Sequence, residues 1–354
     1  MNLTQHTEEA VKLLKGLIST PSFSREEDIT AALLTDRLEK AGIKPAVIKN
    51  NVWALANGFD EAKPTILLNS HHDTVKPVKG WTKDPFSPEV DGDTLFGLGS
   101  NDAGASLVCL LETFLYFSGK NKLPWNLVFL ASAEEEVSGQ NGVELALSKL
   151  PRIDLAIVGE PTQMNLAVAE KGLMVIDAVA PGKSGHAARD EGENAIYNAL
   201  EDIEKIRNYQ FENTSSFLGN VKMSVTLIEA GTQHNVVPDT CKFTIDVRTN
   251  GLYTNREVFD ILQSELKSAL TARSFRLNSS NISIEHPIVK KGLSMGLEAY
   301  GSPTLSDQCL MDFPSVKIGP GDSARSHTAD EFILLSEIEE GIKTYIRLLD
   351  GLVI

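Results

Sequence analysis

The sequence predicts an α/β protein with a mixed, mostly parallel sheet flanked by helices, into which a smaller α+β unit of ferredoxin-like type is inserted. Short apolar runs alternate with helical patterns over residues 1–172, which is typical of a mostly parallel sheet covered by helices. From about Gly172 the predicted order becomes strand, helix, strand, strand, helix, which indicates a separate unit. We therefore expect one domain from 1–172 and 281–354 and an inserted domain at 173–280.

The first domain begins with two helical patterns. Residues 4–18 place their apolar side chains mainly on one helical face. A second helix is expected from Ser24, because Ser24 and Glu27 have the spacing of a capping box, to about Gly42, a residue type that commonly follows a helix.

The apolar runs that follow have the length of strands buried on both faces. They are residues 46–48, 52–56, 65–68, 127–130 and 155–158, with a predicted helix at 105–117. In the inserted domain we expect strands at 173–179, 221–228 and 241–247 and helices at 195–206 and 257–270. The chain after about Ile282 offers a few short strands and a final helix, 336–349, which is too little for a core of its own. We expect this segment to complete the first sheet.

Composition excludes several classes of protein. The chain has 354 residues, of which 42% are hydrophobic and 23% charged, as in ordinary globular proteins. Its formal net charge of -15 argues against nucleic acid or an anionic membrane as a partner. Glu8 and Glu9 stand where a secretory signal needs positive charge, and the longest apolar stretch, 106–117, is too short to span a bilayer.

Cysteine usage points to a reducing compartment. The three cysteines are odd in number and far apart, so neither a zinc ribbon nor a disulfide framework is expected. They are Cys109, Cys241 and Cys309. We expect buried thiols and a cytoplasmic location.

Histidine and acidic residues stand where predicted strands end or glycine-rich turns begin. His71 and Asp73 directly follow a strand, and a metal-binding histidine usually donates its second ring N–H to a carboxylate. The other candidates along the chain are Asp102, Glu134, Glu135, Glu136, Glu160 and His327. Because α/β sheets bind ligands at the carboxyl ends of their strands, these acids would repel one another there unless a cation lay between them. Two imidazoles and three carboxylates suit two Zn²⁺ ions, with Co²⁺ as an alternative.

The order and context of these motifs resemble the M20 metallopeptidase and deacylase family over almost the whole chain. The likeness is strongest to the branch that contains acetylornithine deacetylase and succinyl-diaminopimelate desuccinylase. The resemblance implies that His71 and Glu160 hold one zinc ion, that Glu136 and His327 hold the other, and that Asp102 bridges them.

The resemblance also implies a catalytic set. Glu135 would take a proton from the attacking water and pass it to the leaving amine, while Asp73 would assist His71. A second register stays open, in which Glu134 is the base and Glu135 the ligand. The spacing to the following glycines favours Glu135 and Glu136.

Three departures from the family pattern are visible. Leu98 stands where arginine is common, residues 103–105 replace Met-Lys-Gly, and Glu134 replaces an aspartate. The resemblance further implies a cis peptide bond between Asp102 and Ala103.

Substrate contacts and assembly are also implied by the resemblance. His186 matches a histidine of the family's inserted lid domain that reaches the partner subunit's active site, so a homodimer with an oxyanion contact from His186 is expected. Asn235 and Arg248 stand where the family places substrate contacts, and arginine can bind a carboxylate through two hydrogen bonds. Further candidates are Gly321, Ser323 and Arg325. Asn235 and Arg248 could instead only stabilise strand ends.

The function implied is removal of an acetyl or succinyl group from N-acyl ornithine or N-acyl citrulline in arginine biosynthesis. A succinyl-diaminopimelate desuccinylase, an aminoacylase and a dipeptidase are alternatives within the family. A non-catalytic metal-binding protein is a remote alternative. A dehydrogenase is disfavoured because Gly97-Leu98-Gly99 lacks the third glycine of the dinucleotide-binding motif.

Overall fold

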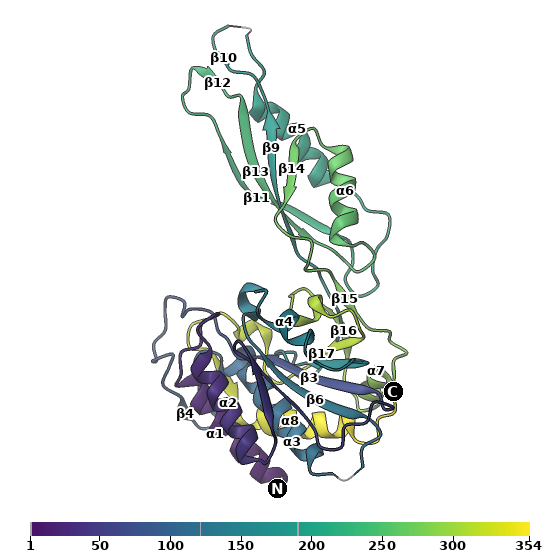
Figure 1. Cartoon of the computed structure of the whole chain (residues 1–354). Coiled ribbons are helices and arrows are strands. Elements are labelled where there is room, and N and C mark those ends of the chain that lie inside the picture. Colours follow the sequence, from purple (N-terminus) through teal and green to yellow (C-terminus); the bar gives the residue numbers. More distant parts are fainter. Residues whose placement is uncertain (1, 121, 190) are drawn as a thin grey trace. The chain divides into compact units, whose positions relative to one another are not determined.

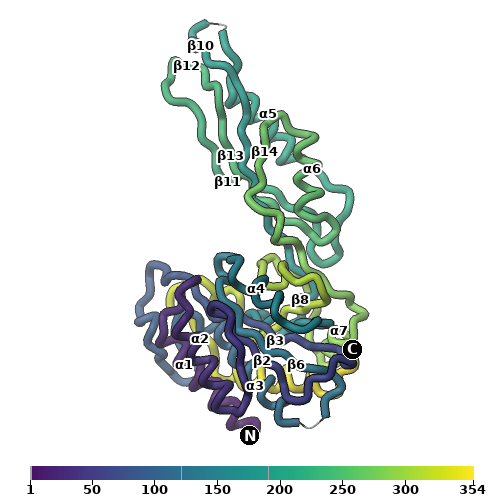
Figure 2. Tube along the Cα trace, in the orientation of Figure 1, coloured from purple at the N-terminus to yellow at the C-terminus, as the bar shows by residue number. Residues whose placement is uncertain are grey.

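The computed structural model describes residues 2–120, 122–189 and 191–354. Contacts between Cα atoms divide the chain into two compact units, with the middle of the chain forming the second (Figure 2). Unit 1 consists of Met1–Val168, Ile282–Tyr300 and Ser306–Ile354, and unit 2 of Ala169–Asn281 and Gly301–Leu305. Both chain ends therefore belong to unit 1.

The large sheet is mixed, as the sequence predicts (Figure 1). Its order is β1-β2-β6-β3-β7-β17-β8-β15, with β16 paired to β8. The strands are β1 (Pro45–Ile48), β2 (Asn51–Leu55), β3 (Thr65–His71), β6 (Asn126–Ser132), β7 (Leu155–Val158), β8 (Leu166–Glu170), β15 (Ser280–Asn281), β16 (Ala299–Ser302) and β17 (Ser315–Lys317). The neighbours β6, β3, β7 and β17 are parallel, whereas β1, β2, β8 and β15 pair antiparallel.

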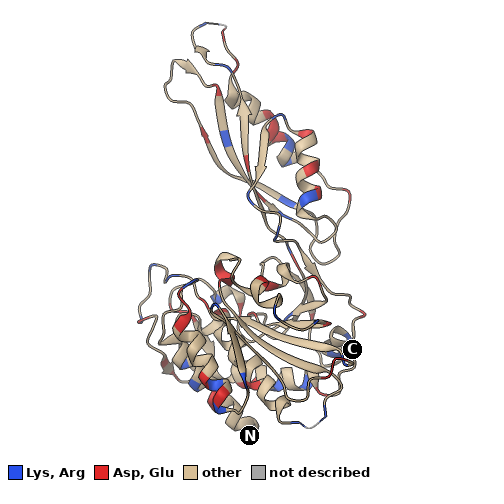
Figure 3. Cartoon of the chain, viewed as in Figure 1, with Lys and Arg blue, Asp and Glu red and all other residues tan. Residues whose placement is uncertain are grey.

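Both faces of the central strands are buried, because alternate side chains enter two different cores. Leu68 and Phe129 enter the larger core, which the helices of unit 1 complete, whereas Leu67 and Val128 enter a smaller one beside α4. The helices are α1 (Leu3–Ile18), α2 (Asp28–Lys40), α3 (Ala105–Ser118), α4 (Val143–Leu147), α7 (Pro287–Ser294) and α8 (Leu335–Leu349). The central strands carry few charged side chains (Figure 3), as expected for strands buried on both faces.

Three helices of unit 1 meet at one buried carboxylate. Glu112 of α3 is fully buried and accepts hydrogen bonds from Arg37 of α2, with Nε at 2.9 Å, and lies 2.7 Å from Nδ1 of His6 in α1. A buried charge is stabilised only when it is paired in this way. These contacts fix α3, whose first turn directly follows the turn that contains Asp102.

The expected start of the second helix is wrong. The helix begins at Asp28 rather than at Ser24, because the Ser24 hydroxyl donates to the Asp73 carboxylate at 2.7 Å instead of capping the helix. The Glu27 carboxylate accepts the backbone N–H of Arg25 at 2.6 Å. The Ser24 side chain therefore supports the segment after β3, whereas the Glu27 carboxylate accepts the N–H groups of Arg25 and Glu134.

Unit 2 is an α+β unit with the element order of a ferredoxin-like fold. It contains β9 (Met174–Pro181), α5 (Ala195–Asn208), β11 (Lys222–Ala230), β13 (Thr240–Arg248), α6 (Asn255–Glu265) and β14 (Ala269–Ala272). The antiparallel sheet has the order β11-β13-β9-β14, and its apolar side chains share one core with α5 and α6. A separate pair is formed by β10 (Gly185–His186) and β12 (Val236–Val237).

The last helix predicted for the inserted domain is too long. It ends at Glu265, and Ala269–Ala272 pairs with β9 as a fourth strand. The buried Asp202 carboxylate accepts the backbone N–H groups of Lys267 and Ser268 at 3.1 and 2.8 Å. These hydrogen bonds turn the chain out of the helix, and no sequence pattern indicates them.

Shorter elements complete the described part of the chain. A small sheet has the order β18-β5-β4, from β4 (Glu89–Asp91), β5 (Thr94–Phe96) and β18 (Phe332–Leu334). Single turns are η1 (Ser100–Gly104), η2 (Glu135–Val137), η3 (Asp307–Leu310) and η4 (Ser323–Arg325). Within the described residues, no helix has both the length and the apolar character that crossing a membrane requires. The three cysteines, all described, form no disulfide, and Cys309 is only partly buried.

Candidate metal centre

The candidate ligands gather at the carboxyl edge of the parallel strands. His71 is the last residue of β3, and the acidic turn Glu134–Glu136 follows shortly after β6 ends. Glu160 comes two residues after β7, and His327 follows β17 by a longer connection. Because parallel neighbours end at the same edge, residues up to 256 positions apart in sequence are brought together.

His71 lies at the middle of the group. Its Nε2 atom is 3.3 Å from Oδ1 of Asp102, 3.8 Å from Oε1 of Glu160 and 4.0 Å from Oε2 of Glu135. Its Nδ1 atom is 3.0 Å from the backbone oxygen of Asp73. Nδ1 of His71 is therefore engaged by the backbone oxygen of Asp73, and Nε2 is the ring nitrogen that faces the acids.

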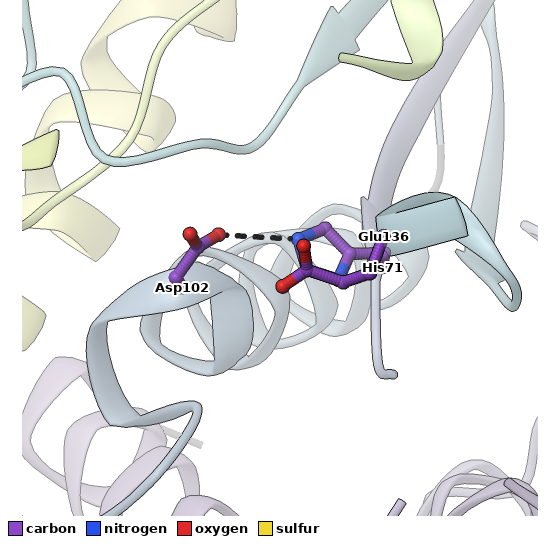
Figure 4. A group of neighbouring side chains, drawn as sticks. All are labelled: His71, Asp102 and Glu136. Carbon is purple, nitrogen blue, oxygen red and sulfur yellow. Dashed lines mark hydrogen bonds and ion pairs between the residues drawn. The ribbon is translucent and has the colours of Figure 1, made fainter. Parts of the chain in front are cut away.

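A second histidine approaches from the other side of the group. Nε2 of His327 is 3.1 Å from Oε2 of Glu136 and 3.6 Å from Oδ2 of Asp102. The two Asp102 oxygens thus face different histidines. Ligand atoms of His71, Asp102 and Glu136 all lie within 4.8 Å of one another (Figure 4).

The Asp73 carboxylate holds the acidic turn. Its Oδ1 and Oδ2 atoms accept the backbone N–H groups of Glu135 and Glu136, both at 3.1 Å. Oδ2 also accepts the Ser24 hydroxyl. Both carboxylate oxygens of Asp73 therefore hold the turn. Nδ1 of His71 lies closer to the Asp73 backbone oxygen, at 3.0 Å, than to the expected carboxylate, at 3.5 Å.

The Glu134 side chain belongs to a different environment from its two neighbours. Its carboxylate accepts a hydrogen bond from Asn141 Nδ2 at 3.0 Å and lies 3.9 Å from Nε of Arg25. Its backbone has a positive φ of 55°, which turns the chain so that Glu135 and Glu136 are presented to the histidines. This geometry favours the register with Glu135 and Glu136 in the site.

The turn that presents Asp102 has irregular backbone. The peptide bond between Asp102 and Ala103 is cis, as expected. Gly321 packs directly against this turn, since a Cβ atom there would lie 2.3 Å from Oδ1 of Asn101, and its φ is +86°. A glycine at 321 thus allows the two segments to meet.

Burial and charge shift the pKa values of the group. Burial raises the pKa of Glu135 well above its ordinary value, and the charges of neighbouring acids raise it further. The charge of His71 lowers this pKa, but by less than burial raises it. Burial likewise raises the pKa of Glu160 to about 8. Although burial lowers it, hydrogen bonds to Asp102 and Asp73 raise the pKa of His71 well above 6.5. The acids are therefore costly to ionise together without positive charge between them.

Two further buried acids were not among the sequence candidates. The Asp307 carboxylate accepts the Ser132 hydroxyl at 2.6 Å, and burial raises its pKa to about 6. Burial also raises the pKa of Glu331 to about 7, and its carboxylate accepts the backbone N–H of Asp102 at 3.0 Å. Their hydrogen-bond partners are distant in sequence, so local spacing does not indicate these contacts, although Glu331 ends the Ser-His-Thr-Ala-Asp-Glu segment that contains His327.

The donor set fits a divalent transition metal. Imidazole nitrogens and carboxylate oxygens are the usual ligands of Zn²⁺ when cysteine is not used. The half-buried carboxylates around His71 are also groups whose charge bound cations would neutralise.

Two of the unit 2 candidates, His186 and Asn235, lie close together at the paired strands β10 and β12, whereas Arg248 ends β13. His186, in β10, accepts the backbone N–H of Ala188 at Nδ1, at 3.1 Å. Asn235 is exposed, and its backbone oxygen accepts the N–H of Ala187. Arg248 pairs with Asp246, with Nε to Oδ1 at 2.8 Å. Their roles toward a substrate stay predictions.

The remaining candidates lie in the segment before His327. Ser323 opens η4, whose first turn is capped by Asp322. The Arg325 guanidinium binds Glu337 at 2.7 and 3.1 Å and stacks 4.5 Å from the Phe332 ring centre. Arg325 is thus already paired within unit 1, and its contact with a substrate stays a prediction.

Comparisons with known proteins agree on one family. The model of peptidase family M20/M25/M40 matches residues 67–351. A succinyl-diaminopimelate desuccinylase of Wolbachia pipientis is 24% identical over 89% of this chain and 82% of that protein. An acetylornithine deacetylase of Edwardsiella ictaluri is 26% identical over 91% and 92%. The crystal structure of aminopeptidase PepT from Bacillus cereus shares the fold, with a TM-score of 0.76, 17% identity and coverage of 97% and 98%.

Metal binding can be tested by stoichiometry. Metal-free protein titrated with Zn²⁺ or Co²⁺ should bind about two ions per chain. His327→Ala and Glu160→Ala should each retain about one ion, whereas Asp102→Ala should weaken both sites. Elemental analysis after equilibrium dialysis measures this directly.

The matched control is Asp330→Asn, which changes an exposed carboxylate close to His327 in sequence that instead contacts Thr82. This variant should bind two ions like the parent. Two ions bound by Asp102→Ala with parental affinity would refute the bridging role.

Proposed function

The chain belongs to peptidase family M20/M25/M40, a family of metallohydrolases, and we propose that it removes an acetyl or succinyl group from N-acyl ornithine or N-acyl citrulline, in arginine biosynthesis. The observation that carries the hydrolase proposal is the close grouping of His71, Asp102 and Glu136. Glu135 lies beside that group as a half-buried acid, with Oε2 4.0 Å from Nε2 of His71. A metal site with an adjacent acid is the arrangement that water-mediated amide hydrolysis needs.

We propose that His71 and Glu160 hold one ion, Glu136 and His327 the other, and Asp102 both. Zn²⁺ or Co²⁺ bound there would polarise the amide carbonyl and make a water molecule more acidic. The two Asp102 oxygens support the bridging role, because each faces a different histidine.

Glu135 is the proposed general base. Its carboxylate takes a proton from the attacking water as the oxygen bonds to the amide carbon, and it returns the proton to the nitrogen as the C–N bond breaks. The products are the free carboxylic acid and the amine. A carboxyl group beside the proposed ligands, with Oε2 4.0 Å from Nε2 of His71, is placed to make both transfers.

The choice of substrate rests on the relatives and on the residues. The two curated relatives carry the names of an acetylornithine deacetylase and a succinyl-diaminopimelate desuccinylase, so both acyl groups are represented. The desuccinylase name supports N-succinyl diaminopimelate as the second candidate. We propose that Arg248 contacts the substrate carboxylate and that Asn235 is a further substrate contact. Gly321, Ser323 and Arg325 are the other proposed substrate-binding residues.

We further propose that unit 2 forms a homodimer. β11 is an edge strand, and its Leu227 and Ile228 are 64% and 56% exposed. Tyr197 of α5 is 66% exposed. An apolar edge strand with open hydrogen-bonding groups favours pairing with a second copy. In such a dimer His186 would donate to the developing oxyanion of the partner's substrate.

The substrate can be tested directly. Zinc- or cobalt-loaded protein should be assayed with the acetyl and succinyl derivatives of ornithine and citrulline, and with succinyl-diaminopimelate, N-acetyl amino acids and dipeptides. An ornithine or citrulline derivative should have a kcat/KM at least ~10-fold above the others. Preference for succinyl-diaminopimelate or a dipeptide would refute the pathway while leaving amide hydrolysis intact.

The base can be tested at two neighbouring positions. Glu135→Gln should bind metal like the parent and lose ~10²–10⁴-fold in kcat, because it cannot accept a proton. Glu134→Gln should retain most activity, since its side chain contacts Asn141 and not the histidines. The opposite result would assign the base to Glu134, and parental activity in both variants would end the proposal.

A role for His186 across the dimer predicts complementation. His186→Ala and Glu135→Gln should each be nearly inactive as homodimers. Co-expressed in equal amounts, they should recover about a quarter of the parental activity, because half of the dimers are mixed and one site in each is complete. No recovery in mixed dimers isolated with two different tags would place His186 in its own subunit's site or outside catalysis.

A further inference from the structure

The segment that carries His327 is bonded at two places to the turn that carries Asp102. At one place the side chain of Asn101 accepts the N–H of Asp322 at 3.0 Å and donates to the Asp322 oxygen at 3.1 Å and to Ser326 Oγ at 3.2 Å. At the other, Gly97 donates its N–H to the backbone oxygen of Glu331 at 3.0 Å. Residues 97–102 and 322–331 are therefore joined on both sides of His327.

The Glu331 side chain adds a further contact between the segment that carries His327 and the turn that carries Asp102. Its Oε1 atom accepts the backbone N–H groups of Asn101 at 2.9 Å and of Asp102 at 3.0 Å. Glu331 is only 2% exposed, so water does not compete for these donors. The next residue, Phe332, pairs with Phe96 in the small antiparallel sheet, which fixes the backbone of Glu331 relative to this turn.

We propose that Glu331 is a positioning residue of the metal centre, which holds the Asp102 carboxylate at a fixed place relative to His327 and thereby sets the affinity for metal ions. The proposal rests on the ligand roles given above for Asp102 and His327. Groups that orient metal ligands without touching the metal commonly control affinity. A carboxylate is well suited to the task here, because one oxygen accepts two consecutive N–H groups of the turn.

A comparable arrangement elsewhere in the chain, in which the two oxygens of one carboxylate each accept one of two consecutive N–H groups, provides a control. In unit 2 the fully buried Asp202 accepts the consecutive N–H groups of Lys267 and Ser268, remote in sequence from every proposed ligand. Loss of this carboxylate should lower stability and leave the metal centre unchanged. Asp202→Asn therefore separates damage to folding from damage to metal binding.

The test compares Glu331→Met, which keeps volume but removes the acceptor, with Glu331→Gln, which keeps an acceptor oxygen. Competition with a chromogenic chelator should show a ~10–100-fold loss of Zn²⁺ affinity in Glu331→Met and a loss within about 3-fold in Glu331→Gln. Asp202→Asn should bind Zn²⁺ like the parent. Parental affinity in Glu331→Met would overturn the proposal.

Hydrogen exchange of the metal-free proteins gives a readout that does not depend on metal or on activity. Exchange of the peptide that contains residues 97–104 should rise in Glu331→Met and stay parental in Glu331→Gln and in Asp202→Asn. Unchanged exchange in Glu331→Met would refute the positioning role even if the parent binds no metal and the proposed function fails.

If Glu331→Met does not fold, as judged by the lack of a cooperative unfolding transition, Glu331→Asp replaces it in the test. Glu331→Asp keeps the charge but withdraws the carboxylate by one methylene, so it should lose several-fold in affinity and raise exchange at 97–104. Parental values for both would then overturn the proposal.

Discussion

The structure depends on keeping several carboxylates close together at one edge of a sheet. Asp102, Glu135, Glu136 and Glu160 surround His71, and burial raises the pKa of Glu135 and of Glu160. Two kinds of interaction make such a group tolerable: cations between the acids, and donors that hold each acid in place. The parallel strands supply the edge, and the irregular turns after the strands carry the candidate ligands.

Much of this arrangement could be predicted from sequence because its signals are local. Apolar runs followed by a histidine or an acid located strand ends, and the carboxyl edge of a parallel sheet is shared by all of them. The predicted strand at 155–158 matches β7, and the predicted helix at 105–117 matches α3 within one residue. The gathering of His71 with Asp102 follows from that logic, as does the approach of His327 to Glu136.

The errors and omissions involve partners that are distant along the chain. Ser24 has the spacing of a helix cap, yet its hydroxyl serves Asp73, 49 residues away. No local sequence signal marks the end of α6. The chain leaves the helix where Asp202 of α5 accepts the N–H groups of Lys267 and Ser268. Glu331 receives the N–H groups of a turn about 230 residues earlier. Every residue except proline has the same backbone N–H group, so the sequence does not indicate which carboxylate will accept a hydrogen bond from it.

An acid follows each histidine closely in sequence, and each of these acids holds a proposed ligand that faces the other histidine. Asp73, two residues after His71, accepts the N–H of Glu136, the proposed partner of His327. Glu331, four residues after His327, accepts the N–H of Asp102, which contacts His71. Each histidine segment thus fixes an acid that faces the other histidine. Displacing either segment would therefore disturb both proposed ion positions, because each segment carries a ligand of its own and holds a ligand that faces the other histidine.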